Sequence, residues 1–267
     1  MVSAADRVQN PGMTSVWLDQ RPPSRARRTD QPAGLDREKI VAASVRLLDA
    51  EGLDKFSMRR LAAELGVTAM SLYWYVDTKN DLLELALDSV HSEIRIPHED
   101  AHWHDRIRQL TAQCRELIVR HVWVAHLAGH FLNIGPHARA LSNAVLDVIR
   151  ATGLPLERQA GALAAVFQFV YGFGTIEGHF AQRSANAGLT QEEYYQQSMS
   201  AVRGQPGFDQ MIESSERLMD ARGGDTVEEM RNRDFTYALD LLIAGIEAIR
   251  EQDRKGPGGR ESSRGAE

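Results

Sequence analysis

The sequence predicts an all-α protein built as a three-helix, helix-turn-helix head followed by a larger α-helical body. Apolar residues recur at three- and four-residue spacings along most of the chain, as in amphipathic helices, and no segment alternates convincingly as a strand would. Glycine and proline mark the joints between these helices. The chain of 267 residues is long enough for a small head and one larger domain.

The first helix of the head is predicted from Asp36 to Glu51. Asp36 has the side chain of an N-cap, and Leu35 can pack against Ile40 as a hydrophobic staple. Gly52 then ends the helix, because glycine readily adopts the backbone conformation that follows a helix C-terminus.

A second helix from Phe56 to Leu65 leads into a glycine turn and a short third helix. Ser57 is placed to cap the second helix, and Gly66 can reverse the chain with a positive φ. Thr68 can cap the third helix, which therefore begins just after the turn. The order of helix, glycine turn and helix predicts a helix-turn-helix unit.

The third helix carries the side chains that we expect to contact DNA. Leu72 and Val76 face back toward the second helix, whereas the start of the third helix is the part that such a unit inserts into the major groove. The alternative is that the aromatic residues only pack the head and that the arginine is a solvated surface residue. The candidate base contacts are Thr68, Ala69, Met70 and Ser71, and the other candidate DNA contacts are Arg59, Tyr73, Trp74, Tyr75 and Lys79.

The stretch from Leu35 to Val90 resembles the head of the tetracycline-repressor (TetR) family of transcriptional regulators. The resemblance rests on the AEG turn, the S-M-R-R-L-A-x-x-L-G-V run, the S-L-Y-W-Y-V helix and the K-x-x-L-L opening of the fourth helix. It implies a homodimer that places two recognition helices on a palindromic double-stranded DNA operator. It also implies that Lys79 and a matching tyrosine hold the DNA backbone, and that a small-molecule effector releases the operator.

The charge of the chain is divided between its two parts. The net charge is −6, yet the first 79 residues carry 12 Lys and Arg against 10 Asp and Glu. Such a balance excludes a histone-like or RNA-coating protein. DNA affinity must then come from a small set of placed contacts, made twice in a dimer.

The cysteine count and the hydropathy predict a cytoplasmic protein. Cys114 is the only cysteine, so there is no disulfide framework. We find no segment with the length and flanks of a signal peptide or a membrane span, and we therefore expect no membrane contact.

Four regions are expected along the chain. Residues 1–34 form a disordered basic leader, with Arg21, Arg25, Arg27 and Arg28 just before the first helix; the alternative is a basic arm that enters the minor groove. The head with its connector helix occupies residues 35–95, the ligand-binding and dimerisation domain residues 96–254, and a flexible tail residues 255–267.

The body reads as a series of helices and resembles the ligand-binding domain of the tetracycline-repressor subgroup. The resemblance begins at the Leu-Pro start of a long helix and ends at the F-x-Y-A-L-D-L-L-I-A-G-I-E run in the last helix of the body. The expected helices span residues 81–95, 102–120, 122–131, 136–152, 155–185 and 227–252, with short pieces and loops between residues 188 and 225.

Two of these helices have broad apolar faces, and the family pairs its last long helices between subunits. The resemblance therefore implies a dimer interface on the helices 155–185 and 227–252. The alternative is that the faces form the core of a monomer. The candidate interface residues are Val166, Val170, Phe235, Leu239, Leu242 and Ile246.

An apolar pocket with a few polar ends is expected in the body for the effector, whose identity the sequence does not give. Aromatic residues at helical spacing can equally be core. A bulky aromatic or polyketide-like effector is implied by the family alone. The candidate pocket residues are Trp123, Phe131, Asn133, Phe167, Gln168, Phe173, Glu177 and His179.

Nine histidines lie beyond residue 90, and a metal sensor is therefore one alternative. His126 and His130 stand four residues apart on an expected helix, and His102 and His104 stand two apart. The family holds a magnesium-tetracycline chelate through histidines, but the first of these positions falls on Arg95, so tetracycline is not expected. We predict no bound metal and no cofactor.

An enzyme is the competing class of function. The sequence has no Gly-rich phosphate loop, no G-x-S-x-G and no metalloprotease helix, so catalysis is not expected. A second rival is a protein that keeps the fold of the head but acts only through protein contacts.

Overall fold

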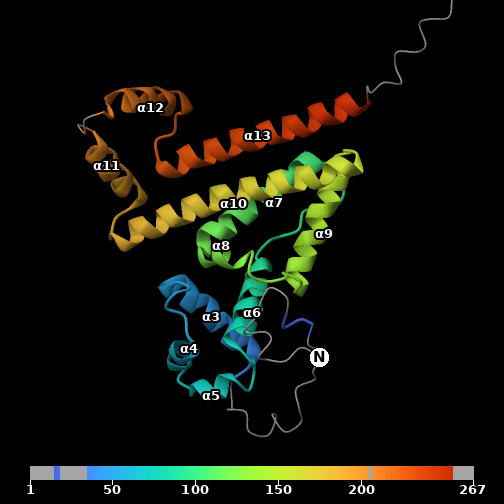
Figure 1. The fold of residues 1–267 in the computed structure, drawn as a ribbon, viewed down its shortest axis with the longest axis vertical. Coiled ribbons are helices and arrows are strands. Elements are labelled where there is room, and N and C mark those ends of the chain that lie inside the picture. The colour runs from blue at the N-terminus through green and yellow to red at the C-terminus, as the bar shows by residue number, and fades with distance from the viewer. Residues whose placement is uncertain (1–14, 19–34, 204, 206, 255–267) are drawn as a thin grey trace, which may run out of the picture. The chain divides into compact units, whose positions relative to one another are not determined.

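The computed structural model describes residues 15–18, 35–203, 205 and 207–254. Over these residues the chain is helical and contains no strand, which confirms the all-α prediction (Figure 1). It divides into two compact units, residues 1–99 with 112–145, and residues 100–111 with 146–267. The division falls within helices α7 (Trp103–Arg120) and α9 (Pro136–Ala151). The domain limits expected near residues 34, 95 and 254 stay a prediction.

The first unit begins with the three helices of the head, α3 (Arg37–Glu51), α4 (Met58–Leu65) and α5 (Ala69–Leu72) (Figure 1). The predicted caps of α3 are confirmed: the Asp36 carboxylate accepts a hydrogen bond of 2.7 Å from the Lys39 backbone N–H, and Gly52 has φ 80°. Local chemistry therefore sets both ends of this helix.

The turn between α4 and α5 also forms as the sequence predicts. Ser57 accepts a hydrogen bond from the Arg60 N–H, and Gly66 has φ 66° in the left-handed region. Thr68 then accepts from the Ser71 N–H at 3.2 Å, which starts α5. These two hydrogen bonds and the left-handed glycine fix where α5 leaves the turn.

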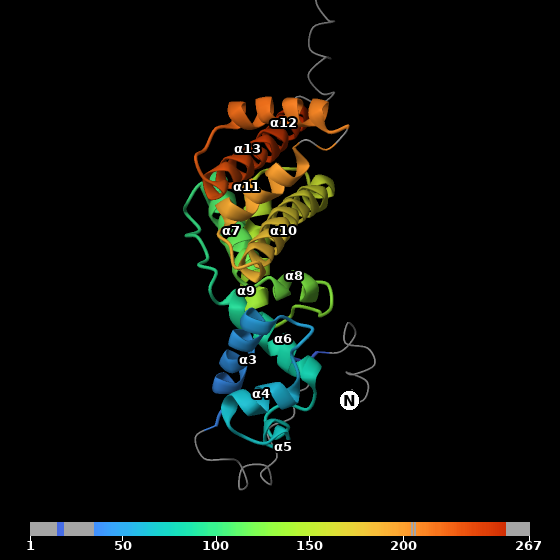
Figure 2. The same ribbon diagram turned by 90° about the vertical axis from the view of Figure 1, so that its left-hand side faces the viewer.

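Helix α6 (Lys79–His91) packs against α3 and completes the core of the head (Figure 2). Thr78 and Asp81 form a reciprocal capping box at its start. The core of the head is apolar and fully buried, with Ile40, Leu48, Phe56, Leu61, Leu72, Val76, Leu82 and Leu87 among its members.

Three acidic residues, Asp81, Glu84 and Asp88, are buried on one side of α6. Besides the capping box at Asp81, the Asp88 carboxylate accepts a hydrogen bond of 2.9 Å from the Ala138 N–H and lies 3.0 Å from the His137 Nδ1. Asp88 thereby caps the first turn of α9. Each acid holds a different segment, so the buried charges are compensated by specific partners.

Glu84 binds part of the segment that we expected to be a disordered leader. The Ser15 hydroxyl donates to Glu84 Oε1 at 2.5 Å, and the Val16 N–H donates to Oε2 at 2.8 Å. Ser15 is buried, and residues 16–18 form a turn. The expectation of disorder is therefore wrong for residues 15–18, because a buried carboxylate needs these donors. The arginine cluster and the tail after residue 254 lie outside the described residues.

The rest of the first unit consists of the second half of α7, the short helix α8 (Trp123–Leu127) and the start of α9. The helix expected over residues 122–131 is shorter than predicted. His130 lies in the turn after α8 rather than on the same helix as His126.

The second unit is built on two long helices, α10 (Leu156–Asn186) and α13 (Val227–Arg254), which run side by side (Figures 1 and 2). Three rings join them: the Phe235 centroid lies 4.9 Å from Phe169 and 5.4 Å from Phe173. Between them in sequence, α11 (Gln191–Val202) packs on both α10 and α13, and α12 (Asp209–Arg222) packs on α13.

Helix α10 corrects the expectation that no segment reaches the apolar length of a membrane span. It is long and apolar enough to cross a membrane by length and composition, and it is the one such helix in the part of the chain that the structure describes. A core helix of a soluble protein passes the same test, so this helix alone is weak support for a membrane span.

Candidate DNA-binding and effector-binding sites

Helix α5 is held by its inner face and leaves its outer face uncovered. Leu72 and Val76 are buried in the head, as predicted. On the other side Met70 is 70% exposed and Tyr73 is also exposed. A short helix with an exposed thioether and phenol is well placed to contact another surface, and a thioether can pack against thymine methyl groups.

Arg59 and Arg60 on α4 have different surroundings. The Arg60 guanidinium binds the Glu51 carboxylate, with Nε 2.9 and 3.2 Å from its two oxygens, and a Glu64 oxygen lies 3.8 Å from Nη1. Arg59 is exposed and forms no hydrogen bond or ion pair with any residue that the structure describes. Of the two arginines, Arg59 is the one whose charge is available to a phosphate.

The remaining candidates of α5 are partly engaged within the head. The Thr68 hydroxyl caps α5 and lies 2.9 Å from the Ser71 hydroxyl, while Ala69 and Trp74 are half-buried. Lys79 is the first residue of α6, and its Nζ lies 5.6 Å from the centre of the Phe56 ring. A cation at the start of a helix adds to the positive end of the helix dipole.

Tyr75 has a structural partner that the sequence reasoning missed. Its hydroxyl donates a hydrogen bond of 2.7 Å to the Leu35 carbonyl oxygen, 40 residues away in the chain. Burial and the nearby Asp36 charge raise the pKa of the Tyr75 phenol. The residue therefore ties the start of α3 to the end of the α5 segment, and its hydroxyl proton is not free for a phosphate. Its role as a DNA contact stays a prediction.

Three of the candidate effector residues lie in the first unit. Trp123 is buried, and its indole Nε1–H donates to Asp49 Oδ1 at 2.7 Å, so it anchors α8 to α3. Asn133 adopts φ 51° and donates to the Ala128 carbonyl at 2.7 Å, while Phe131 is buried. The polar atoms of Trp123 and Asn133 thus already have partners within the chain.

The other five candidates lie on α10 in the second unit. Phe167 and Gln168 are exposed, and His179 is half-buried. Phe173 belongs to the aromatic cluster with Phe169 and Phe235, and Glu177 is buried. The candidate pocket residues are thus divided between the two units. Their role in binding an effector stays a prediction.

His121 forms a buried polar site that the sequence reasoning missed. Its Nδ1 lies 2.7 Å from Asp49 and its Nε2 lies 3.0 Å from Glu93. Burial alone would lower the pKa of His121, but the hydrogen bonds and charges of Asp49 and Glu93 outweigh it, and the pKa is raised. The His121 ring, which directly follows α7, thus contacts both Asp49 on α3 and Glu93 in the segment after α6. The only local signal was the pairing of His121 with Trp123 two residues later.

Most of the candidate interface residues face the interior of the second unit, and their role in a dimer stays a prediction. Val166, Val170, Phe235, Leu239 and Ile246 are buried within the single chain, and Leu242 is half-buried. A helix buries one face, so a partner subunit can meet only the opposite one. The exposed large apolar side chains of α10 and α13 are Leu156, Phe167, Ile176, Tyr237 and Leu241.

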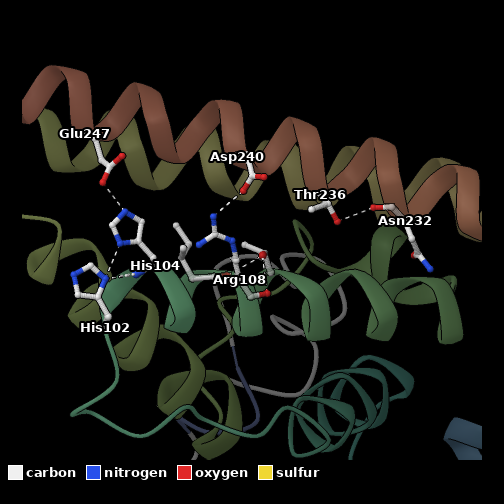
Figure 3. Close-up of polar contacts among 9 residues, drawn as sticks. His102, His104, Arg108, Asn232, Thr236, Asp240 and Glu247 are labelled. Carbon is white, nitrogen blue, oxygen red and sulfur yellow. Dashed lines mark hydrogen bonds and ion pairs between the residues drawn. The ribbon is translucent and has the colours of Figure 1, made fainter. Parts of the chain in front are cut away.

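The two histidine pairs do not assemble a metal site in the described part of the chain. The Nδ1 atoms of His102 and His104 lie 2.6 Å apart, and His104 Nε2 lies 2.7 Å from Glu247 Oε1 on α13 (Figure 3). Within the described residues no group of three or more His, Cys, Asp or Glu could hold a metal ion.

The family models match both parts of the chain. Residues 40–86 match "Bacterial regulatory proteins, tetR family", and residues 96–250 match "Tetracyclin repressor-like, C-terminal domain". The first match runs from within α3 to within α6 and includes all of α4 and α5.

Three of the similar proteins and structures come from Saccharopolyspora and Streptomyces species. An HTH-type transcriptional regulator of Saccharopolyspora erythraea is 40% identical over 164 residues, which are 61% of this chain and 67% of that protein. The HTH-type transcriptional repressor DrrR1 of Streptomyces coeruleorubidus is 29% identical over 90% of this chain and 86% of its own. The TetR family protein ActR of Streptomyces coelicolor, solved in complex with actinorhodin, has a TM-score of 0.64 at 25% identity, covering 81% of this chain and 97% of its own.

The two family models together cover most of the chain, and the repressor-like body model alone spans residues 96–250. The head has the predicted helix-turn-helix geometry with an uncovered recognition helix. The chain belongs to the tetR family of bacterial regulatory proteins and is a ligand-responsive, DNA-binding transcriptional regulator.

Proposed function

We propose that this regulator is a repressor that binds a palindromic operator as a homodimer and releases it when an aromatic effector binds the body. The observation that carries the DNA contact is the uncovered face of α5, where Met70 is 70% exposed while Leu72 is fully buried. A recognition helix of this kind lies in the major groove, and two copies reach two half-sites about one helical turn apart.

The contacts on each half-site divide by type. Met70 and the small residues beside it meet base edges, whereas Arg59, Tyr73 and Lys79 meet phosphates. Met70 has no pair of hydrogen-bonding groups that would distinguish a guanine or an adenine from other bases. We therefore expect that only a few base pairs in each half-site are essential for binding.

Selection of bound duplexes from a random DNA library with the purified protein tests this function. Enrichment of an inverted repeat, with affinity that falls steeply as salt rises, supports the dimeric repressor. Enrichment of a single half-site without its repeat, or of no sequence at all, contradicts it.

Individual substitutions then test the assigned contacts. We expect Arg59→Ala and Tyr73→Ala each to weaken operator binding about tenfold, because each removes a contact to a phosphate. Arg139→Ala is the matched control, since Arg139 is an exposed arginine of α9, outside the helix-turn-helix unit. Fluorescence anisotropy of a labelled operator measures all three. Equal losses in the control and in Arg59→Ala would contradict the assignment.

An effector in the body would act by favouring a state whose heads are wrongly spaced for the operator. The likeness to ActR, solved with actinorhodin, supports a small-molecule effector, and the aromatic residues of α10 support an aromatic one. Aromatic compounds that bind the body should displace the labelled operator. Tight binding of such compounds with unchanged operator affinity would refute release as the mechanism.

The same experiments address the rival of a regulator that acts only through protein contacts. A protein of that kind would enrich no duplex, and Arg59→Ala would not change its affinity for DNA. We also propose that this regulator acts in the cytoplasm, where a bacterial operator is accessible.

A further inference from the structure

Four side chains near the start of α7, His104, Arg108, Trp103 and Arg106, have two kinds of surroundings. One group faces α13 and is fully paired: His104 Nε2 lies 2.7 Å from Glu247, and Arg108 Nη2 lies 2.7 Å from Asp240 (Figure 3). These contacts belong to the second unit and hold the start of α7 against α13. The other group consists of Trp103 and Arg106, which have no such partners.

Arg106 is a buried guanidinium without a counter-ion. The residue is only 6% exposed, and its Nε is fully buried without a hydrogen-bond acceptor. It forms no ion pair or hydrogen bond with any part of the chain that the structure describes. Its two terminal nitrogens are not among the fully buried unpaired atoms, so the small exposed part of the residue includes these nitrogens.

Trp103 adds a second unpaired donor one helical turn earlier. The residue is 4% exposed, and its indole Nε1 is also buried without an acceptor. Residues three apart lie on the same side of a helix, so the indole N–H and the guanidinium occupy neighbouring positions on α7. The Trp103 ring stacks on His104, with centroids 3.8 Å apart, which fixes the position of the indole.

A buried charge without a partner opposes folding, and an apolar side chain of the same size would serve the core better. Two such donors, side by side in a ligand-responsive domain, therefore indicate an acceptor that the chain itself does not supply. We infer that Trp103 and Arg106 bind the anionic end of the effector, and that this effector is an aromatic carboxylate. This inference rests on the proposed function, because it assigns the effector's charge.

The chemistry of the two residues selects this class of ligand. A guanidinium fork binds both oxygens of a carboxylate, and the indole N–H donates a further hydrogen bond to one of them. A neutral amide of the same shape cannot form this charged pair. The Arg106 site therefore discriminates between an acid and its amide.

A matched pair of probes tests the inference on the full chain: anthraquinone-2-carboxylate and anthraquinone-2-carboxamide. We expect the wild type to bind the carboxylate at least tenfold more tightly than the amide, measured by quenching of tryptophan fluorescence. Arg106→Met should lose at least tenfold in affinity for the carboxylate and keep its affinity for the amide. Trp103→Phe should lose a few-fold for the carboxylate alone.

Arg108→Met is the control, because Arg108 lies two residues away on the same helix but is exposed and paired with Asp240. It should bind both probes as the wild type does. The inference is overturned if the wild type does not bind the carboxylate or shows no preference for it, or if Arg106→Met retains the preference.

Unfolding by denaturant separates a binding role from a structural one. If Arg106 is held for a ligand, Arg106→Met should be as stable as the wild type or more stable in the absence of probe. A clear loss of stability would mean that the arginine has a structural partner and would overturn the inference. Operator binding without probe tests the proposed repressor separately. If Arg106→Met binds the operator but keeps the wild-type selectivity between the two probes, only this inference is overturned. If the wild type selects no operator, the proposed function is overturned.

Discussion

At the scale of single residues, His121 is a buried group whose charge affects the stability of the first unit. It is buried between two carboxylates, Asp49 and Glu93, and its second neighbour Trp123 donates to the same Asp49 oxygen. Because Asp49 belongs to α3, the His121 ring connects a helix of the head with the start of the body. Neutral imidazole could donate to only one of the two carboxylates.

The raised pKa of His121 predicts a pH dependence of stability. Its folded-state pKa lies above the ordinary value of 6.5, so its stabilisation is fully present below that value and is lost as pH rises through the folded pKa. We expect the difference in free energy of unfolding between the wild type and His121→Gln to shrink as the pH is raised from 6 toward 9.

Urea denaturation across this pH range measures the effect. His130→Gln serves as the control, because His130 is an exposed histidine outside this buried cluster. A stability difference that stays constant or grows with pH would contradict the proposed charge state of His121.

At the scale of elements, the turn into the recognition helix depends on one backbone conformation. Gly66 has φ 66°, and a Cβ at this position would meet nothing within 4 Å. A side chain there would clash with nothing, so its only cost would be the strain of holding a non-glycine residue at a positive φ. We expect Gly66→Ala to destabilise the protein by about 1 kcal/mol and to weaken operator binding, because α5 follows directly.

Gly161→Ala is the matched control within α10, where a Cβ also meets nothing. There alanine should stabilise the protein by roughly 0.5–1 kcal/mol, because alanine has a higher helix propensity than glycine in a helix interior. Guanidinium denaturation of both variants measures the two effects. If the two substitutions shift stability in the same direction, the turn is not limited by its positive φ.

The elements also explain which features could be predicted from the sequence. The caps at Asp36, Ser57 and Thr68 act over three residues, so their chemistry is local and their helices began where we expected. Contacts that span the chain leave no such pattern. The Tyr75 hydrogen bond to Leu35 joins residues 40 apart, and the Trp123 hydrogen bond to Asp49 joins residues 74 apart. The sequence therefore led us to predict Tyr75 as a DNA contact and Trp123 as an effector contact.

The sequence alone does not place the dimer interface, for a related reason. Helical periodicity identifies an apolar face, but α10 and α13 each have apolar residues on two sides. Phe235 and Leu239 are buried within the chain, while Tyr237 and Leu241 on the same helix remain exposed. Only the packing of the second unit decides which side is left for a partner.

At the scale of the whole molecule, the exposed apolar residues of the second unit predict where two subunits meet. Leu241 on α13 is 76% exposed, and Ile176 on α10 is also exposed. Large apolar side chains in such positions mark interaction surfaces when they are grouped. We expect Leu241→Glu to convert the dimer to a monomer at micromolar concentration and to lower operator affinity, because two half-sites need two heads.

Sedimentation equilibrium measures the association, and anisotropy measures the operator affinity. Leu218→Glu is the control, since Leu218 is 73% exposed on α12. It should leave the dimer intact. A Leu241→Glu protein that remains dimeric would place the interface elsewhere.

The pairing of Ser15 with Glu84 sets a limit on how recombinant versions of this regulator can be trimmed. The family match begins only at residue 40, which suggests residue 35 as a natural starting point for a shortened protein. Such a protein would keep every helix of the head, yet its buried Glu84 would lose both of its donors. Burial already raises the pKa of Glu84, and without these donors the carboxylate would favour its protonated form still more strongly. A shortened version would therefore lose stability as the pH rises toward neutrality, so affinity tags and cleavage sites belong before residue 15.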